Sequence, residues 1–344
     1  MSAKSNSLWK DARKWLPGVL ISIVAVAVLF RLARWQDLKL AFASIQPIYF
    51  AGAALLTFIS LGTRAQAWRT LLENRTTFRK AFLIVNEGYM LNNLFPLRAG
   101  EIGRAVFMGQ VTGLGPFHVL STIVIERIFD LAMAAALLLA TLPLALEMAW
   151  AKPVAIVTLA LVIIGLTVMY LAARNHEKVH GWIVRFSPRW GFFQKLIIPQ
   201  LDSLLNGLAV LRRPSQFVLS FLWIAASWAL WVLMYYLMLL PIAPGAPLWW
   251  AMFTDGVLAM GIAIPSAPGA LGVYEASVVA ALGILGISAS AALAYAITMH
   301  FIQFVLTGIF GFIGLLQDGR SLGNLFSELR IQQQQNQSQS SNLE

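Results

Sequence analysis

The feature that most constrains this chain is a series of apolar segments, each close to the length of a helix that crosses a lipid bilayer. Such a crossing needs about 20 consecutive apolar residues. Of the 344 residues, 59% are apolar and 12% are charged, whereas soluble domains carry roughly twice that share of charge. The sequence therefore predicts an all-α polytopic membrane protein with about six full transmembrane helices. These are expected at residues 15–33, 47–68, 118–142, 153–172, 217–240 and 289–316.

Basic residues between the apolar segments predict the orientation of the chain, because loops rich in lysine and arginine stay in the cytoplasm. The N-terminal segment, residues 69–80 and the long polar connection 173–214 each carry more basic than acidic residues. They are expected in the cytoplasm, together with both chain ends, whereas residues 143–152 and 241–248 fit the outside. The net charge of +10 is then a consequence of orientation, and a nucleic-acid partner is not expected.

Counting the crossings leaves two segments, 81–117 and 249–287, that each begin and end on one side of the membrane. Each is interrupted by proline and glycine, which remove a backbone donor or weaken a helix. Irregular backbone at membrane depth survives only inside protein or beside a watery cavity. Because the arms are short, we favour two broken, re-entrant helical hairpins, although the counting also allows full crossings. The expected break residues are Pro96 and Gly100 in the first hairpin, and Pro265, Pro268, Gly269 and Gly272 in the second.

The two hairpins are predicted to enter from opposite sides and to share a layout. Each break ends in a glycine with a glutamate at the start of the next helix, Glu101 or Glu275. Paired, interrupted segments of opposite topology indicate an inverted-repeat transporter with its site between them. The alternative is that proline and glycine are simply common in membrane helices. On this organisation residues 1–316 form a single transmembrane domain, and residues 317–344 form a partly disordered cytoplasmic tail.

Ionisable residues inside a bilayer are costly and indicate functional sites, and many of them cluster here at the first break and on the helix after it. Arginine grips phosphate in bidentate fashion, and a helix N-terminus at Glu101 would add backbone donors. The arginines are therefore expected to bind a lipid headgroup phosphate, and the acids to position them or carry protons. The alternative is a closed ion-pair network that only holds helices together. The predicted site residues are Asn92, Asn93, Arg98, Glu101, Arg104, Glu126, Arg127, Asp130, Tyr274 and Glu275.

Three motifs at these positions resemble the lysylphosphatidylglycerol synthase transmembrane-region family, also called the flippase-like family. They are Asn92–Arg104, Glu126–Asp130 and Pro268–Glu275. The resemblance implies a multi-pass protein of the bacterial cytoplasmic (inner) membrane. In relatives fused to an aminoacyl-lipid synthase, this region moves the modified phospholipid between leaflets. Only a short tail follows the last apolar segment here, so other anionic lipids, including polyprenyl-phosphate-linked ones, are open as cargo.

The sequence thus favours a lipid flippase or transporter that is not an enzyme and uses no cofactor or metal. Its expected partners are membrane lipids with anionic headgroups, with a cell-envelope biosynthesis enzyme as a further candidate. One rival is an intramembrane enzyme acting on lipid-linked substrates, and another is a non-catalytic partner of a cell-envelope lipid or glycan synthase. Residues His176–His180 match the zinc pattern H-E-x-x-H. They lie in the basic connection with Asp202 as the nearest downstream acid, which favours solvated charge.

Overall fold

The computed structural model describes residues 20, 22–29, 31, 35–95, 98–146, 213–264 and 266–318, with scattered positions between 153 and 181. Regular structure in this part of the chain is entirely helical. The helices are α2 (Trp35–Ser44), α3 (Pro47–Leu71), α4 (Phe78–Leu94), α5 (Ala99–Thr112), α6 (Pro116–Leu146), α10 (Pro214–Leu239), α11 (Leu248–Gly261), the 3-10 turn η3 (Pro268–Ala270), α12 (Val273–Ile284) and α13 (Ala289–Gln317).

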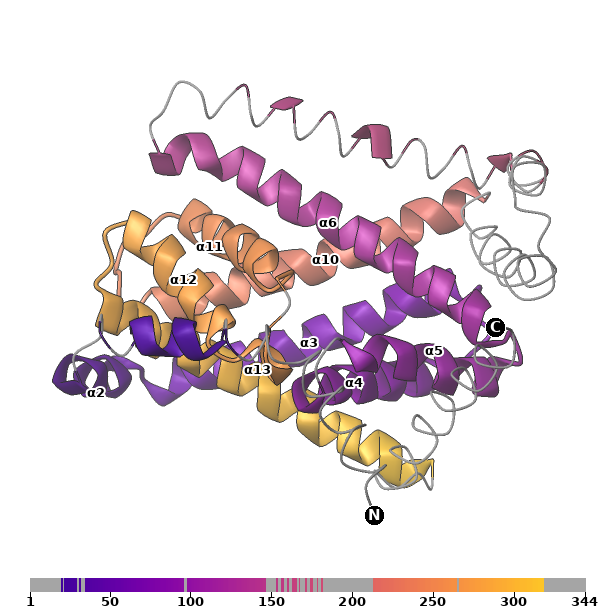
Figure 1. Cartoon of the computed structure of the whole chain (residues 1–344), viewed down its shortest axis with the longest axis horizontal. Helices are drawn as coiled ribbons and strands as arrows, with labels where there is room; N and C mark the ends of the chain where they lie inside the picture. Colours follow the sequence, from indigo (N-terminus) through magenta and orange to yellow (C-terminus); the bar gives the residue numbers. More distant parts are fainter. Residues whose placement is uncertain are drawn as a thin grey trace, which may run out of the picture.

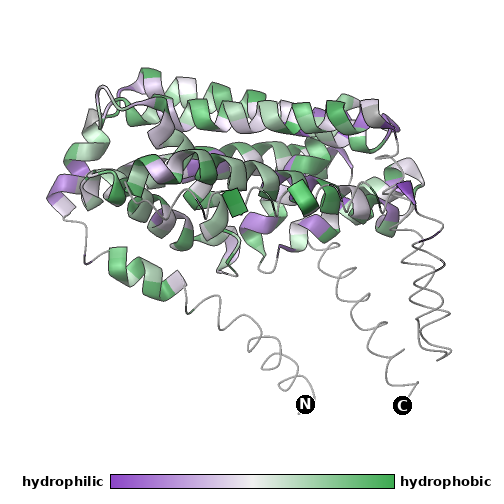
Figure 2. Ribbon diagram, turned by 90° about the horizontal axis from the view of Figure 1, so that it is seen from above, coloured by the Kyte–Doolittle hydropathy of each residue, from purple (hydrophilic) through white to green (hydrophobic). Residues whose placement is uncertain are grey.

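Four of these helices, α3, α6, α10 and α13, are long and apolar enough to cross a membrane. They match four of the six predicted crossings, and the chain is a polytopic membrane protein. Of the other two predicted crossings, the described positions of 15–33, which are residues 20, 22–29 and 31, are helical, whereas only scattered positions of 153–172 are described. Helix α6 continues past Pro143 to Leu146, beyond the predicted end, since membrane helices tolerate proline. Hydrophobic residues run along the lengths of the helices in Figure 2, and many large apolar side chains are exposed, as a lipid-facing surface requires.

Small and hydroxyl residues let the long helices approach one another. The hydroxyls of Ser60 on α3 and Ser227 on α10 lie 2.9 Å apart, and Gly52 on α3 packs against Leu237 on α10. Small residues and hydroxyl bonds replace the hydrophobic effect as the source of helix association in lipid. The helix starts also follow from the sequence, since the Ser288 hydroxyl accepts the N–H of Ala291 at the start of α13.

Two pairs of short helices complete the fold, and both coincide with the segments predicted to be interrupted. Helix α4 packs against α5, and α11 packs against α12. In Figure 1 the two pairs lie toward opposite ends of the molecule, and α13 runs past both of them, in contact with α4 and α12. Helix α2, which the apolar pattern did not indicate, packs against α13. The long helix α13 therefore connects the two interrupted segments.

Candidate functional site

The first break joins α4 to α5 at Arg98, whose backbone is left-handed (φ 53°, ψ 40°). This conformation costs about 1–2 kcal/mol for a residue with a side chain, so its surroundings must hold it. The side-chain oxygen of Asn92 accepts the backbone N–H of Gly100 at 2.8 Å. It thereby satisfies one of the free donors at the start of α5. Asn92 shapes the break, whereas Pro96 lies outside the described residues.

Glycine allows the backbones of α4 and α5 to touch. A Cβ atom at Gly100 would overlap the carbonyl oxygen of Gly88 and lie 2.7 Å from the Asn92 oxygen. A Cβ at Gly88 would in turn overlap the side chain of Arg104. Any larger residue at either glycine would separate the two helices. Gly100 therefore serves close packing as well as the break that the sequence indicated.

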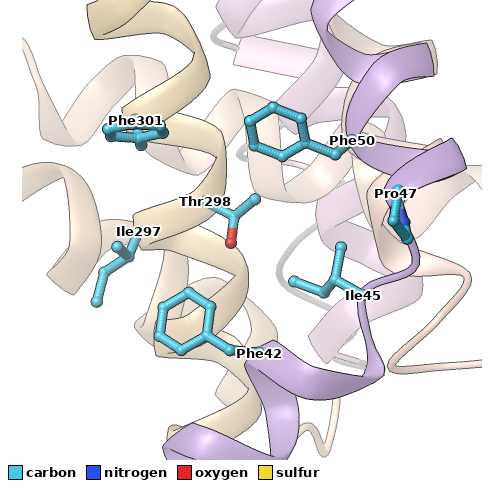
Figure 3. Close-up of a pocket in the computed structure, with 7 residues that line it drawn as sticks. All are labelled: Phe42, Ile45, Pro47, Phe50, Ile297, Thr298 and Phe301. Carbon is cyan, nitrogen blue, oxygen red and sulfur yellow. The ribbon is translucent and has the colours of Figure 1, made fainter.

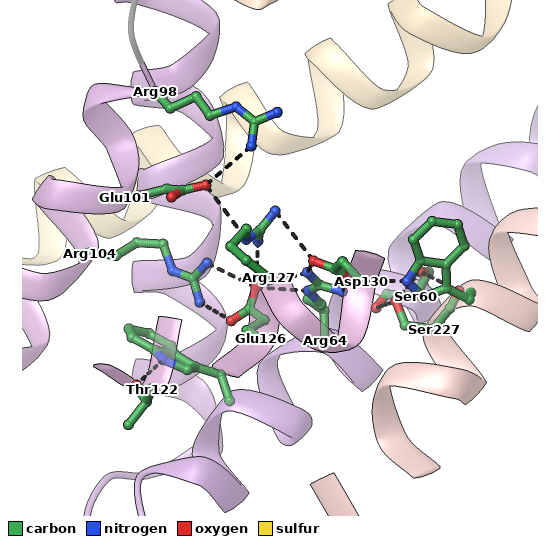
Figure 4. A network of polar contacts seen from close by, with 12 residues as sticks. Ser60, Arg64, Arg98, Glu101, Arg104, Thr122, Glu126, Arg127, Asp130 and Ser227 are labelled. Atoms are coloured by element: carbon green, nitrogen blue, oxygen red, sulfur yellow. Dashed lines mark hydrogen bonds and ion pairs between the residues drawn. The ribbon is translucent and has the colours of Figure 1, made fainter. Parts of the chain in front are cut away.

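Glu126 on α6 is the centre of an ion-pair network (Figure 4). Its buried carboxylate accepts hydrogen bonds from Arg104 at 2.7 and 3.1 Å, from Arg127 at 2.7 Å and from Arg64 at 3.0 Å. Arg104 is only 1% exposed, and its guanidinium carbon lies 4.2 Å from the centre of the Trp68 ring. Carboxylate and indole together stabilise this buried charge. In this arrangement Arg104 faces its protein partners and not an open space.

Arg64 on α3 belongs to the same network, although the sequence analysis did not single it out. Its guanidinium contacts both carboxylate oxygens of Asp130, one of them at 2.5 Å, as well as Glu126. The indole N–H of Trp228 on α10 also donates to Asp130, at 3.0 Å. The sequence feature that could have identified Arg64 is its position well inside an apolar helix of 25 residues, where an ionisable side chain is costly. The network thus ties α3, α5, α6 and α10 to one another.

Two arginines lie at the exposed edge of the network. The side chain of Arg127 is 32% exposed, contacts Glu126 and lies within ion-pair distance of Glu101 and Asp130, at 3.6 and 3.3 Å. The side chain of Arg98 is 48% exposed, with Glu101 at 3.9 Å. A guanidinium has five N–H donors, so both side chains keep donors toward the open side. The exposed Arg98 and the half-buried Arg127 therefore differ in accessibility from the buried Arg64 and Arg104.

The charges of the network do not cancel. Within the described residues its ion pairs join four arginines to three carboxylates, which leaves one positive charge in excess. The closed, balanced network that the sequence allowed counted three of each, because it left out Arg64. An excess positive charge in a setting of low dielectric attracts an anion strongly. Of the four arginines, Arg98 and Arg127 have the more exposed side chains, at 48% and 32%.

The second break joins α11 to α12 through a turn with three left-handed residues, Gly269 (φ 66°), Ala270 (φ 54°) and Gly272 (φ 81°). Glycine adopts this conformation without steric cost. The N–H of Gly272 donates to a carboxylate oxygen of Glu275 at 2.7 Å, so this acid caps the start of α12. The other Glu275 oxygen lies 2.6 Å from Nδ1 of His300 on α13. Pro268 begins η3, and Pro265 lies outside the described residues.

The two breaks touch. A guanidinium nitrogen of Arg98 donates to the carbonyl oxygen of Ile262, at the end of α11, at 3.0 Å. Gly269 of the second break lies against the backbone of Asn93, at the end of α4. The Asn93 side chain also donates to the hydroxyl of Thr307 on α13, at 3.1 Å. Asn93 and Arg98 of the first break therefore meet Ile262 and Gly269 of the second break at one junction.

Tyr274 and Glu275, the last two predicted site residues, lie in a second polar cluster, where among the described residues Glu275 pairs with His300 and not with an arginine. The Tyr274 hydroxyl is 2.9 Å from that of Tyr235 on α10, and its ring stacks on His300 with centres 4.1 Å apart. Asp255 on α11 is buried nearby, and one of its carboxylate oxygens has no hydrogen-bond partner among the described residues. The sequence placed these residues in one constellation with the arginines, but the fold divides it into two neighbouring clusters.

An apolar cavity of about 420 Å³ lies between α13 and the corner formed by the end of α2 and the start of α3 (Figure 3). The Thr298 hydroxyl on its wall is already bonded to the carbonyl oxygen of Ala294, at 2.8 Å. Its surface therefore suits hydrocarbon and not a charged headgroup. It is lined by Phe42, Ile45, Pro47, Phe50, Ile297, Thr298 and Phe301.

Metal binding finds no support in the part of the chain that the structure describes, where no group of three or more His, Asp or Glu side chains is placed to hold an ion. The zinc-like motif is not tested by this observation. His176, Glu177 and His180 lie outside the described residues.

Comparison with known proteins identifies a family and one relative that cover most of the chain. The sequence profile of the lysylphosphatidylglycerol synthase TM region matches residues 15–311. The chain belongs to this family. A UPF0104 membrane protein from Methanothermobacter thermautotrophicus is 24% identical to this chain, over 94% of it and 99% of the relative. The lysylphosphatidylglycerol synthase TM region therefore accounts for all three motifs that carried the resemblance, because each lies within the matched residues.

Proposed function

We propose that this protein is a lipid flippase or transporter that moves an anionic phospholipid or a polyprenyl-phosphate-linked lipid between the leaflets of its membrane. The observation that carries the proposal is the exposure of Arg98 and Arg127 at the junction of the two breaks, on a network with one excess positive charge. A lipid phosphate is the anion available at membrane depth. Family membership supports a role with lipids, since the family is named after an enzyme that modifies phosphatidylglycerol.

The predicted site residues fall into two groups, those whose side chains are partly exposed and those that are buried against one another. Arg98 and Arg127 bind the headgroup phosphate, since guanidinium N–H groups match phosphate oxygens in pairs. Glu101 lies between them and holds them in place. Arg104 and Glu126 are buried against each other and act as the frame, together with Arg64 and Asp130. No side chain in this scheme performs a chemical step, so we propose a transporter and not an enzyme.

The membrane arrangement is part of the proposal. Both helix pairs are re-entrant hairpins of an inverted repeat, entering from opposite sides and meeting at Arg98 and Ile262. The basic connections and both chain ends lie on the cytoplasmic side of a bacterial inner membrane. Two opposed interruptions that meet at one junction support this arrangement. Lipids with anionic headgroups are the proposed partners, and a cell-envelope biosynthesis enzyme that makes or uses them is a further one.

The test is lipid exchange by purified protein in proteoliposomes. A fluorescent anionic phospholipid in the inner leaflet becomes accessible to an external quencher when the protein moves it. Hydrogen bonds to charged groups contribute about 1.5–3 kcal/mol, so we expect Arg98→Ala to slow exchange by roughly tenfold or more. Arg98→Lys keeps the charge but loses the paired donors, and should retain an intermediate rate.

The matched control is Arg75→Ala, which removes an exposed arginine from the turn between α3 and α4. It lowers the net charge equally and should leave exchange unchanged. The backbone strain at position 98 is the same for arginine and alanine, since both carry a Cβ atom, so Arg98→Ala should fold normally. Equal exchange rates for wild type, Arg98→Ala and Arg75→Ala would refute the headgroup role.

A further inference from the structure

The second polar cluster contains an acid and an imidazole that the headgroup site does not use. Glu275 and His300 are both buried, and a carboxylate oxygen lies 2.6 Å from Nδ1 of the ring. The ring is fixed on its face by Tyr274, whose ring centre lies 4.1 Å away with the planes 16° apart. A buried acid–imidazole pair differs from a solvated surface pair, because the cost of burying its carboxylate depends on whether the imidazole carries a proton.

The pair is also part of the second break. The Glu275 oxygen that does not face His300 accepts the N–H of Gly272, the left-handed residue that begins α12. One carboxylate therefore connects the imidazole of α13 to the backbone of the break. A change of charge at His300 changes how strongly Glu275 is held, and with it the start of α12.

The groups around the pair offer no second cation in the described part of the chain. Tyr274 from α12 stacks on His300, the hydroxyl of Tyr235 from α10 bonds that of Tyr274, and Tyr295 from α13 donates to the carbonyl oxygen of Tyr235. From α11, Asp255 is close enough to both Tyr235 and Tyr274 for its charge to act on them. Asp130 from α6 is in turn within electrostatic reach of Asp255. These neighbours are neutral hydroxyls or further acids.

We propose that Glu275 and His300 form a proton-binding site that controls the opening of the second break. With one proton shared between them the pair is electrically balanced and tolerates its apolar surroundings. When the proton leaves, a buried carboxylate remains without a counter-charge, which is costly in a protein interior. Water must then enter, and the backbone directly bonded to the pair is that of Gly272, at the end of the second break. Proton loss therefore opens the break, and proton binding closes it.

The proton site would extend the proposed function by supplying a coupling ion. The second break lies against Asn93 of the first break, so its opening would move the junction where Arg98 and Ile262 meet. This coupling to headgroup movement rests on the proposed function. The proton site itself rests only on the geometry of Glu275, His300 and Gly272.

The experiment uses the absence of cysteine in the sequence. A single cysteine at half-buried Ser266 reports the accessibility of the second break through its rate of modification by a water-soluble thiol reagent, in nanodiscs and without added lipid substrate. A cysteine at exposed Arg75 corrects for the chemical effect of pH on the thiol. A transition coupled to one proton changes the open fraction by at most about tenfold per pH unit. We expect the corrected rate to rise by several-fold to tenfold between about pH 5 and 8.

Glu275→Gln is the decisive variant, because the amide oxygen can still accept the N–H of Gly272 while the charge is lost. It should abolish the pH dependence of the labelling rate. Tyr295→Phe is the matched control, since it removes a buried hydroxyl bond in the same cluster and should keep the pH dependence. A corrected rate in the wild type that does not change with pH, or a pH dependence that survives in Glu275→Gln, would overturn the proposal.

A second measurement covers the case in which the glutamine variant fails to fold. The chain contains four histidines, so replacing the other three leaves His300 as the sole source of imidazole ¹⁵N signals. These signals report directly whether His300 gains or loses a proton, and a His300 that keeps one protonation state while the labelling rate changes would contradict the proposal. Both measurements are made without lipid transport. A proton site without headgroup exchange would therefore refute the proposed function alone, and exchange without a proton site would refute this inference alone.

Discussion

The first and second breaks are built on the same plan, with two short helices joined by irregular backbone, but they are held by different chemistry. At the first break, four arginines and three carboxylates make several ion pairs. At the second break, one carboxylate is shared between an imidazole and a backbone N–H. The difference indicates a division of labour. The first break spreads its charge over many ion pairs, whereas the second break depends on a single acid–imidazole pair, which we propose is switched by one proton.

The two pairs of helices also pack differently. Helices α4 and α5 meet backbone to backbone at Gly88 and Gly100. Where α11 and α12 meet, a Cβ at Gly261 would overlap the hydroxyl of Ser277, which can rotate away, and would lie 2.8 Å from the Ser277 Cβ. The first pair is therefore the more rigid of the two, and the second is better suited to move. The following predictions test this contrast.

The largest effect is expected when the central carboxylate of each break is removed. Glu126→Leu leaves Arg64, Arg104 and Arg127 close together without their shared partner, and removal of one partner from a buried ion pair costs about 3–5 kcal/mol. Glu275→Leu should cost about 1–2 kcal/mol, because His300 can become neutral and one hydrogen bond to the backbone is lost. Thermal unfolding in detergent measures both. Equal losses would show that the two breaks are not held differently.

A smaller contrast is expected from alanine at the packing glycines. Gly100→Ala forces a Cβ against the backbone of Gly88, and overpacking of this kind costs about 1–3 kcal/mol. Gly261→Ala overlaps the Ser277 hydroxyl, which can rotate away, and must displace only the Ser277 Cβ, 2.8 Å away, so its cost should fall at the lower end of that range. Unfolding temperatures of the two variants, compared side by side, test the order. A larger loss for Gly261→Ala would reverse the assignment of the rigid pair.

The predictability of these features from sequence follows from what each depends on. Helix lengths and breaks depend on local composition, so α4, α5, α11 and α12 fall within the predicted hairpins. The partition of the site depends on which helices become neighbours. Tyr274 and Glu275 share motif spacing with the first break, yet α13 and α10 give them His300 and Tyr235 as partners. Spacing along the chain carries no record of those contacts.

Arg64 shows a second limit. The helix that carries Arg64 was correctly predicted over most of its length. The apolar residues around Arg64 made this helix resemble an ordinary membrane crossing. The residue matters because α6 places Glu126 and Asp130 beside it. The charge balance of the site, and so the choice between a closed network and one with excess positive charge, depends on this tertiary contact.

Removal of a single hydroxyl should lower the stability less than loss of a central carboxylate or overpacking at a glycine. Tyr235→Phe removes the bond between the hydroxyls of Tyr235 and Tyr274, which is worth about 1 kcal/mol. If the second break is held mainly by Glu275 and His300, the variant should remain folded and keep its proton-dependent labelling. Loss of the folded state on this one change would show that the hydroxyl, and not the acid–imidazole pair, holds the cluster.

The smallest effect is expected on α13, which contacts both pairs. Its Gly311 lies against the backbone of Asn86 on α4, whereas a Cβ at Gly308 would meet nothing within 4 Å. Gly308→Ala should therefore stabilise the protein by about 0.4–1 kcal/mol, and Gly311→Ala should destabilise it. Parallel unfolding curves check the sign of each change. A destabilising Gly308→Ala would mean that the open side of α13 is in fact occupied.

The central claim is that Arg98 and Arg127 bind an anionic lipid headgroup at the junction of the two breaks. Native mass spectrometry of protein that is gently extracted from membranes with its bound lipids tests this claim most directly. Wild type and Arg75→Ala should retain a lipid that carries phosphate and a net negative charge. Arg98→Ala combined with Arg127→Ala should lose that lipid while keeping neutral or zwitterionic ones. Retention of the same anionic lipid by the double variant would contradict a headgroup site at the junction of the two breaks.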